Sequence, residues 1–390
     1  MTADSVWADL VGQDAAVAQL AAAARDSVTG GPAMTHAWLI TGPPGSGRSN
    51  AARALAAALL SPDQGASRGP EANRALAGAH ESMTVMRTQK SVITIDEVRD
   101  LVTSAQNSPV NARYRVVVIE DADRMAERTS NVLLKAIEEP PPATVWILCA
   151  PSPQDVLTTI RSRCRNVNLR IPPTDAIAEL LVRRDGVEPE RARWAAAAAQ
   201  NHIGRARYLA TSETAPEARR RTLDIPRHLG SLGSTVRLAA RIVEEAEERA
   251  EARTKEKAEA ARAKLLETLG VEPGKNPPPS VRAQVRRFEE DQKRKDARAR
   301  SDEIDSILLE LLSLYRDVLS YQLGRHEGFV NLGEEERIRD MAEASDPTST
   351  LRRIDVIGAA RERLQTNMPP LLVVESAFVG LSNPWLVEPA

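Results

Sequence analysis

The chain has 390 residues, of which 42% are hydrophobic and 27% are charged, and its formal net charge is −2. This length predicts two or three globular domains, and the near-neutral charge offers no general attraction to nucleic acid. No window approaches the roughly 18 consecutive apolar residues of a membrane helix. The first ten residues carry acids where a secretory signal carries basic residues, so we expect a cytoplasmic protein without a membrane partner.

Residues 1–171 alternate short apolar runs with helical patterns. The runs at 36–41, 116–119 and 145–149 are apolar almost throughout, as in strands that are buried on both faces of a sheet. Strands that alternate with helices predict a parallel sheet flanked by helices, and therefore an α/β domain.

The rest of the chain shows only helical patterns, and we expect a small helical lid at 172–225 and an all-helical C-terminal domain at 226–390. Charged residues at i,i+4 spacing predict a solvated helical hairpin at about 241–300, with a docking surface as the alternative. Its turn is expected at 270–279, where four prolines and two glycines stop a helix. An apolar stripe then repeats on one helical face, and we expect it in a domain core, although a contact with a neighbouring subunit is the alternative. The stripe consists of Ile304, Ile307, Leu308, Leu311, Leu312, Tyr315, Val318 and Leu319.

A glycine-rich segment at 42–49 lies between the first apolar run and an alanine-rich helical pattern. Gly42, Gly45 and Gly47 would let backbone N–H groups surround a phosphate at a helix N-terminus. The position that normally holds a phosphate-contacting lysine is Arg48, whose planar guanidinium is a poor replacement for an ammonium. Ser49, which would hold magnesium, is present. We expect a vestigial or weakly binding loop, with a fully active one as the alternative.

The apolar run at 116–119 is followed by Glu120 and Asp121. A site that hydrolyses a phosphate bond has an aspartate first, which binds magnesium, and a glutamate second, which orients the attacking water. A base must lie within about 3 Å of its water, so the shorter Asp121 side chain disturbs this geometry. Two interpretations stay open: weak metal binding, or acids that cap the strand end and bind arginine or backbone donors.

Residues 130–142, with the sequence SNVLLKAIEEPPP, form a capped helix that ends at prolines. We expect Ser130 to be its N-cap and Leu133 and Ile137 to pack inward. As a motif, this segment resembles the helix that follows the Walker B strand in the AAA+ clamp-loader family. Together with the phosphate loop and the entry segment around Gly12 and Gln13, it extends the resemblance over residues 8 to about 210, and the helical C-terminal domain would be the family's collar.

The resemblance concerns three further elements of the family's ATP site. Ala150 and Pro151 lie where the family has sensor 1, and neither side chain offers a hydrogen-bond donor. Arg163, in a Ser-Arg-Cys motif, corresponds to the arginine finger that enters the ATP site of the adjacent subunit. Arg207 lies where the lid carries sensor 2. The alternative for both arginines is an ordinary solvated side chain.

Bacterial members of the family usually have a four-cysteine zinc module where this chain has residues 60–91. The chain has two cysteines, Cys149 and Cys164, which are too few for such a site or for a disulfide framework. His80 resembles a residue at the end of that module, but one histidine cannot hold zinc. We expect reduced thiols and no metal.

These departures imply the non-hydrolysing, delta-prime type of clamp-loader subunit. Such a stator would help to load a sliding clamp onto primer-template DNA, with gamma/tau-type and delta-type subunits as partners. It would require no cofactor, although ATP or ADP with magnesium could occupy the loop weakly or structurally. The alternatives are an ATP-hydrolysing motor subunit or another DNA-directed AAA+ ATPase. A direct DNA-binding module is disfavoured because only 3% of the residues are aromatic.

Overall fold

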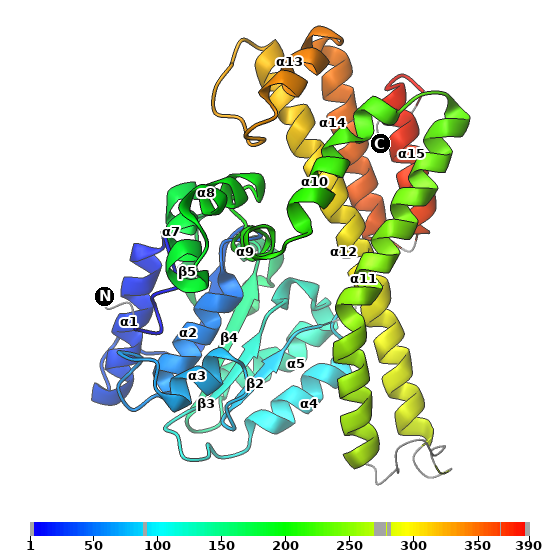
Figure 1. The fold of residues 1–390 in the computed structure, drawn as a ribbon. Helices are drawn as coiled ribbons and strands as arrows, with labels where there is room; N and C mark the ends of the chain where they lie inside the picture. The colour runs from blue at the N-terminus through cyan, green and yellow to red at the C-terminus, as the bar shows by residue number, and fades with distance from the viewer. Residues whose placement is uncertain (1–3, 89–91, 269–277, 279–281, 367, 387–390) are drawn as a thin grey trace. The chain divides into compact units, whose positions relative to one another are not determined.

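The computed structural model describes residues 4–88, 92–268, 278, 282–366 and 368–386. The chain forms two compact units, Met1–Ser212 and Glu213–Ala390, and most of their helices and strands are labelled in Figure 1. The first unit contains the sheet, the helices that flank it and the three helices that follow it, and the second is helical. The predicted lid range 172–225 therefore spans both units.

The first unit is built on a five-stranded parallel sheet with the strand order β2-β3-β4-β1-β5. The three predicted runs are confirmed as the central strands, and each is buried along its whole length because helices cover both faces. The two outer strands were not predicted, since they are short and only partly buried. The strands are β1 (Ala37–Thr41), β2 (Met83–Met86), β3 (Arg115–Ile119), β4 (Thr144–Ala150) and β5 (Arg165–Asn168).

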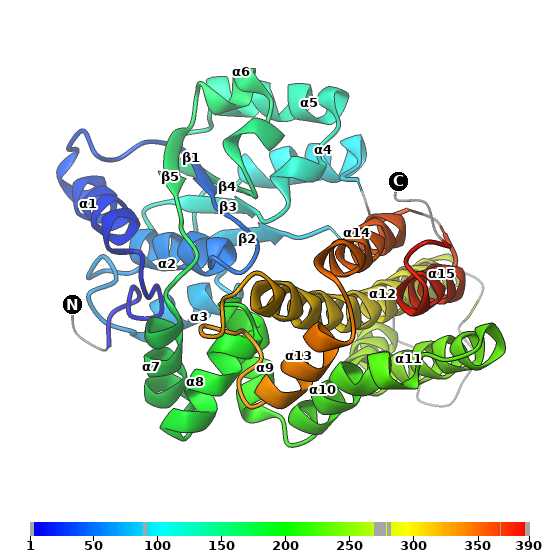
Figure 2. The same ribbon diagram turned by 90° about the horizontal axis from the view of Figure 1, so that it is seen from above.

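Alternate residues of the central strands enter two separate cores. Trp38 and Ile147 pack with α1, α2 and α3 on one face, whereas Leu39 and Trp146 pack with α4, α5 and α6 on the other. Figure 2 shows these two helical layers on either side of the sheet, and the predicted α/β fold is confirmed. The helices are α1 (Asp14–Thr29), α2 (Arg48–Leu60), α3 (Pro70–Leu76), α4 (Ile95–Ala105), α5 (Glu127–Glu138) and α6 (Thr158–Arg161), with short 3₁₀ turns η1 (Ala122–Arg124) and η2 (Pro153–Asp155).

The prediction that Ser130 caps α5 is wrong. The helix begins three residues earlier, at Glu127, with Ala126 at the N-cap position. The Ser130 backbone N–H already donates to the Ala126 carbonyl oxygen at 2.9 Å, and an acid such as Glu127 is favoured in the first turn by the helix dipole. Leu133 and Ile137 are fully buried, as expected.

Three helices complete the first unit: α7 (Thr174–Asp185), α8 (Pro189–Ala198) and α9 (Ile203–Thr211). Within the predicted lid range, residues 189–211 are divided between α8 and α9. Gln200 and Asn201 cause the break, because their φ angles of 50° and 62° are left-handed and cannot continue a helix. The resulting corner places the start of α9 beside the phosphate loop.

The second unit has its core between four helices. The predicted stripe on α12 is confirmed as an internal core: Ile304, Leu308 and Leu311 are at most 1% exposed and pack with α11, α14 and α15. A smaller cluster includes α10 and α13. The helices are α10 (Ala215–Asp224), η3 (Ile225–His228), α11 (Leu232–Thr268), α12 (Arg282–Gln322), α13 (Glu335–Glu343), α14 (Pro347–Leu364) and α15 (Pro370–Ser382).

The charged segment at about 241–300 consists of the C-terminal part of α11 and the N-terminal part of α12. Polar contacts between described residues join these two arms in antiparallel register: Arg300 with Glu247 at 2.8 Å, Thr254 with Asp296 at 3.1 Å, and Arg262 with Glu289 at 3.7 Å. The predicted turn at 270–279 lies outside the described residues except for Pro278. Within the described ranges, none of the helices combines the length and hydrophobicity that a membrane span requires.

Candidate functional site

The predicted phosphate loop and the two acids meet at one edge of the sheet. Central strands β1, β3 and β4 are parallel, so their carboxyl ends lie together. Gly42, Glu120 and Pro151 immediately follow these three strands. The Gly42 N–H donates to the Pro151 carbonyl oxygen at 3.2 Å, which joins the loop directly to the sensor 1 position.

The loop between β1 and α2 has the backbone that its glycines predict. Gly45 and Gly47 have φ angles of 85° and 92°, and Gly47 is the N-cap residue of α2. Gln13, which is buried, supports the loop from outside: its Nε2 donates to the carbonyl oxygens of Arg170 at 2.6 Å and Ser46 at 3.3 Å. The strand, loop and helix order is therefore that of a phosphate-binding turn.

Arg48 folds back onto the loop that it follows. Its guanidinium Nη1 donates to the Gly42 carbonyl oxygen. The charge of Arg48 also acts on its neighbours: desolvation lowers the pKa of His202 and Arg48 lowers it further, whereas burial raises the pKa of Asp123 and Arg48 opposes that rise. Ser49 lies half-buried in the first turn of α2. The side chain at the usual lysine position is thus engaged by the protein's own backbone.

Glu120 is buried and paired with arginine. Arg53 on α2 contacts its Oε1 through Nη2 at 3.0 Å and Nε at 3.2 Å. The Nε of Arg87 lies 3.9 Å from the other carboxylate oxygen. A carboxylate satisfied in this way is a poor ligand for magnesium, because a metal would have to displace a charge-assisted hydrogen bond.

Asp121 has a different environment from Glu120. Its Oδ2 is buried without a hydrogen-bond partner, and Arg124 approaches its Oδ1 only to 3.9 Å. Burial raises the pKa of neighbouring Asp123, and the negative charge of Asp121 raises it further. Among the described acids at this strand end, Asp121 is therefore the carboxylate that could accept a cation.

The lid helix α9 packs on the phosphate loop. A Cβ placed on Gly45 would lie 2.8 Å from both Cα and Cγ of His202, and a Cβ on Gly47 would lie 3.6 Å from Cδ1 of Ile203. His202 Nδ1 accepts the backbone N–H of Arg205 at 3.3 Å and so caps α9. Desolvation lowers the pKa of His202, with smaller contributions from Arg205 and Arg48, and favours the neutral ring.

Substituting Gly45 by alanine is expected to destabilise the first unit more than substituting Gly30. Both glycines have left-handed φ angles, 85° and 74°, so each alanine should cost roughly 1 to 2 kcal/mol. At Gly30 a Cβ meets nothing within 4 Å, whereas at Gly45 it collides with the backbone and ring of His202. Chemical unfolding of the two variants measures the difference, and equal losses would contradict a close packing of α9 on the loop.

Arg207 is not brought to the phosphate loop by a polar contact. Its Nε lies 2.9 Å from Oδ1 of Asp185, at the end of α7, and Nη2 of Arg184 contacts the other oxygen of Asp185 at 2.8 Å. Arg205, two residues earlier on α9, lies close enough to add to the desolvation that lowers the pKa of His202. Arg207 is therefore held by an ion pair with Asp185 on a neighbouring helix.

Arg163 lies at the edge of the sheet opposite to the phosphate loop. It precedes β5, and β5 is parallel to β1, so Arg163 is near the amino ends of the strands. Its Nη2 contacts Oε1 of Glu138 at 2.6 Å, and its Nη1 donates to the Thr159 carbonyl oxygen at 2.9 Å. The side chains of Arg163 and Glu138 are 40% and 39% exposed. Arg163 can therefore reach a neighbouring molecule but not the chain's own loop.

His80 has structural partners. Its Nε2 lies 3.1 Å from Oε2 of Glu71 on α3, and its Nδ1 accepts the Ser82 N–H at 3.0 Å. Across the part of the chain that the structure describes, no group of three or more His, Cys, Asp or Glu side chains is arranged to hold a metal. Burial raises the pKa of both Cys149 and Cys164 to about 12, so neither thiol is a thiolate at neutral pH.

Three side chains at the site were missed by the sequence analysis: Arg53, Arg87 and His202. Arg53 carried a usable signal, because it is a charged residue inside the otherwise apolar stretch of α2. Arg87 and His202 belong to no motif, and only the folded chain brings them to Glu120 and Gly45.

Comparisons with known proteins concern mainly the first unit. The family model described as "DNA polymerase III, delta subunit" matches residues 13–173. The Pseudomonas aeruginosa DNA polymerase III subunit delta' is 34% identical over 173 residues, which cover 43% of this chain and 53% of that protein. The Bacillus subtilis delta' subunit is 27% identical, covering 49% and 59% of the two chains. The Mycobacterium tuberculosis gamma/tau subunit is 33% identical, covering 45% and 31%.

The chain thus spans between about a third and three fifths of the lengths of these relatives. Among solved structures, a DNA polymerase III gamma subunit-related protein from Thermotoga maritima aligns over 89% of this chain and 99% of its own. Its sequence identity is 16% and its TM-score is 0.38.

Proposed function

The chain belongs to the DNA polymerase III clamp-loader family, as a subunit of the delta-prime type, and on this premise we propose that it is a stator that does not hydrolyse ATP. The observation that carries the proposal is the pairing of buried Glu120 with Arg53 at 3.0 Å. This arginine neutralises a carboxylate that a working ATPase directs towards magnesium. The contact of Arg48 with the Gly42 carbonyl and the absence of a donor side chain at Ala150 support the same conclusion.

Arg163 is the group through which such a stator would act on a neighbour. Its ion pair with Glu138 is about 40% exposed on both sides, and exposed pairs are typically worth less than about 1 kcal/mol. Another subunit's nucleotide could therefore displace Glu138 at little cost. We propose that Arg163 enters the adjacent ATP site and stabilises charge on the transferring phosphate.

The proposed partners are gamma/tau-type and delta-type subunits, with the sliding clamp and primer-template DNA bound by the complex as a whole. The chain would act in the cytoplasm, where it requires no metal and no cofactor of its own. If nucleotide does bind, Ser49 and the free oxygen of Asp121 are the groups that would hold its magnesium. That nucleotide would be a structural ligand.

The second candidate function, an ATP-hydrolysing motor subunit, is favoured by one observation. The loop backbone is intact: Gly45 and Gly47 keep their left-handed conformations, and the loop leads into the N-terminus of α2. Phosphate binding by backbone N–H groups does not require the lysine. The positions of Arg53 and Arg48 weigh against hydrolysis, but not against binding.

The stator proposal is tested by reconstitution with gamma/tau-type and delta-type subunits. We expect the chain to join their complex on gel filtration and to be required for loading a labelled clamp onto primed DNA. In the same assay the isolated chain should release no phosphate from ATP. Clamp loading at the full rate without the chain would contradict the proposal, as would ATP turnover by the chain alone.

A further inference from the structure

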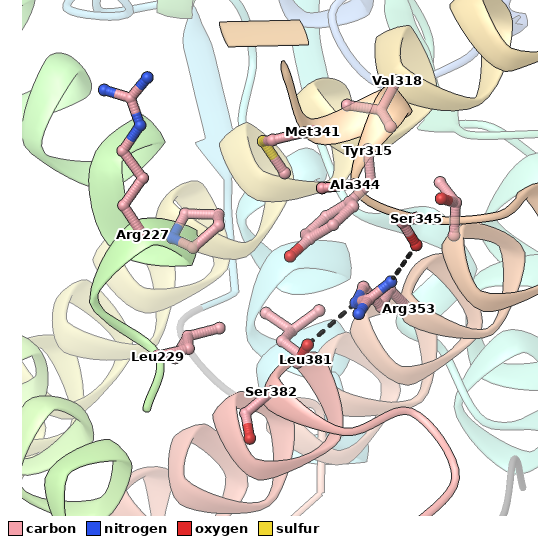
Figure 3. Close-up of a pocket in the computed structure, with 12 residues that line it drawn as sticks. Arg227, Leu229, Tyr315, Val318, Met341, Ala344, Ser345, Arg353, Leu381 and Ser382 are labelled. Carbon is pink, nitrogen blue, oxygen red and sulfur yellow. Dashed lines mark hydrogen bonds between the residues drawn. The ribbon is translucent and has the colours of Figure 1, made fainter. Parts of the chain in front are cut away.

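A pocket of about 220 Å³ lies within the helical second unit (Figure 3). Its walls come from η3, α12, α13, α14 and α15, and all of them belong to one compact unit. A water molecule occupies about 30 Å³ in the liquid, so the pocket has room for roughly seven water-sized groups. The lining mixes apolar side chains, such as Val318 and Met341, with hydrogen-bonding groups.

Arg353 on α14 supplies a positive charge to this pocket without an acidic partner. Its Nε donates to the Leu381 carbonyl oxygen and its Nη1 to the Ser345 hydroxyl, both at 2.9 Å. These contacts hold the guanidinium in place, as Figure 3 shows, but both acceptors are neutral. Among the described residues no carboxylate lies within ion-pair distance of it. The half-buried charge is therefore positioned but not neutralised, which is costly unless an anion binds.

Two hydroxyl groups also line the pocket, and one of them lacks a partner. Thr350 lines the pocket, is 1% exposed, and its Oγ1 is buried without a hydrogen bond. Tyr315 directs its hydroxyl into the pocket in Figure 3, and burial raises its pKa to about 12. It is thus a neutral phenol at physiological pH and able to donate. Buried polar groups without partners are rare in folded proteins and need an explanation.

Arg227 completes the lining but is a weaker anchor. Its guanidinium lies 3.6 Å from Asp224 and 4.0 Å from Asp340, so its charge is partly balanced. The acids near the pocket thus face Arg227 and not Arg353. The pocket thus has one cation without an acidic partner, the hydroxyl groups of Thr350 and Tyr315, and apolar side chains such as Val318 in its wall.

From this arrangement we propose that the pocket is a binding site for a carboxylate on a short aliphatic chain. The carboxylate would accept hydrogen bonds from Arg353, Tyr315 and Thr350, and the chain would lie against Val318 and Met341. A glutamate side chain of another protein and a free short-chain acid have this chemistry in common. The site is independent of the proposed role in clamp loading.

Titration of the full chain with pentanoate, followed by saturation-transfer NMR of the ligand, tests the proposal. We expect saturable binding, at least tenfold weaker binding of the neutral isostere pentanamide, and a loss of at least tenfold in affinity in Arg353→Met. Arg363→Met removes one charge from the same helix outside the pocket and should leave binding unchanged. Thr350→Val tests the site without disturbing the Arg353 contacts. It should weaken the binding of pentanoate several-fold and leave the free energy of unfolding unchanged.

The two ligand sources are separated by competition. An acetylated and amidated tripeptide Ala-Glu-Ala that displaces pentanoate, when its Ala-Gln-Ala counterpart does not, identifies a protein glutamate as the ligand. Displacement by neither peptide identifies a free acid. Equal binding of pentanoate and pentanamide, no saturable binding of pentanoate, or unaltered affinity in both Arg353→Met and Thr350→Val would overturn the proposal.

Discussion

Arg163→Ala is expected to lower clamp- and DNA-stimulated ATP turnover of the reconstituted complex by about a thousandfold at the ATP site that it serves, since an arginine finger supplies at least this factor in phosphoryl transfer. The guanidinium is exposed, precedes β5, and lies at the opposite sheet edge from the chain's own loop. Its loss should therefore act only in trans. Phosphate release at saturating ATP, with the other ATPase subunits unchanged, measures the effect.

A matched control separates the finger from its structural contacts. Glu138→Gln removes the ion pair at 2.6 Å but keeps the guanidinium, so turnover should be retained. Because the pair is exposed, neither variant should lower the free energy of unfolding by more than about 1 kcal/mol. Full turnover in Arg163→Ala would refute the finger. Equal loss in both variants would show that the contact matters for packing and not for chemistry.

The central part of the fold was predictable because its signal is local. Strands β1, β3 and β4 are apolar along their length, since helices bury both of their faces. Outer strand β5 buries only Val167 fully, and β2 only Met83, so neither has a continuous apolar run. The stripe on α12 was also readable, because a helix that packs on three others must repeat its apolar residues.

The candidate site was only partly predictable, for a physical reason. Glycines that allow a left-handed backbone and acids that follow a buried strand are identified by their position in the chain. Their partners are chosen by tertiary contacts: Arg53 reaches Glu120 across 67 residues, and His202 covers Gly45 from another helix. The start of α5 was misplaced because Ser130 is a good capping residue. In the structure the N-cap is Ala126, and the helix has already begun before Ser130.

Arg48→Lys is expected to leave the isolated chain without ATP turnover, although it restores the side chain of a working phosphate loop. A lysine can place a point charge near the beta and gamma phosphates and should tighten nucleotide binding. Hydrolysis also needs a carboxylate for magnesium and a group that orients water. Glu120 would still be paired with Arg53, and Ala150 would still offer no hydrogen-bond donor.

The measurement compares wild type and Arg48→Lys, each as an isolated chain, by phosphate release and by titration with a fluorescent ATP analogue. Tighter analogue binding without phosphate release is the expected result, since binding uses the loop backbone and hydrolysis uses the acids. Arg53→Met in the Arg48→Lys background would then free Glu120 and show whether its pairing is the remaining barrier. Turnover near 1 s⁻¹, the lower end of typical enzyme rates, in Arg48→Lys alone would mean that a single side chain had silenced an otherwise complete ATPase.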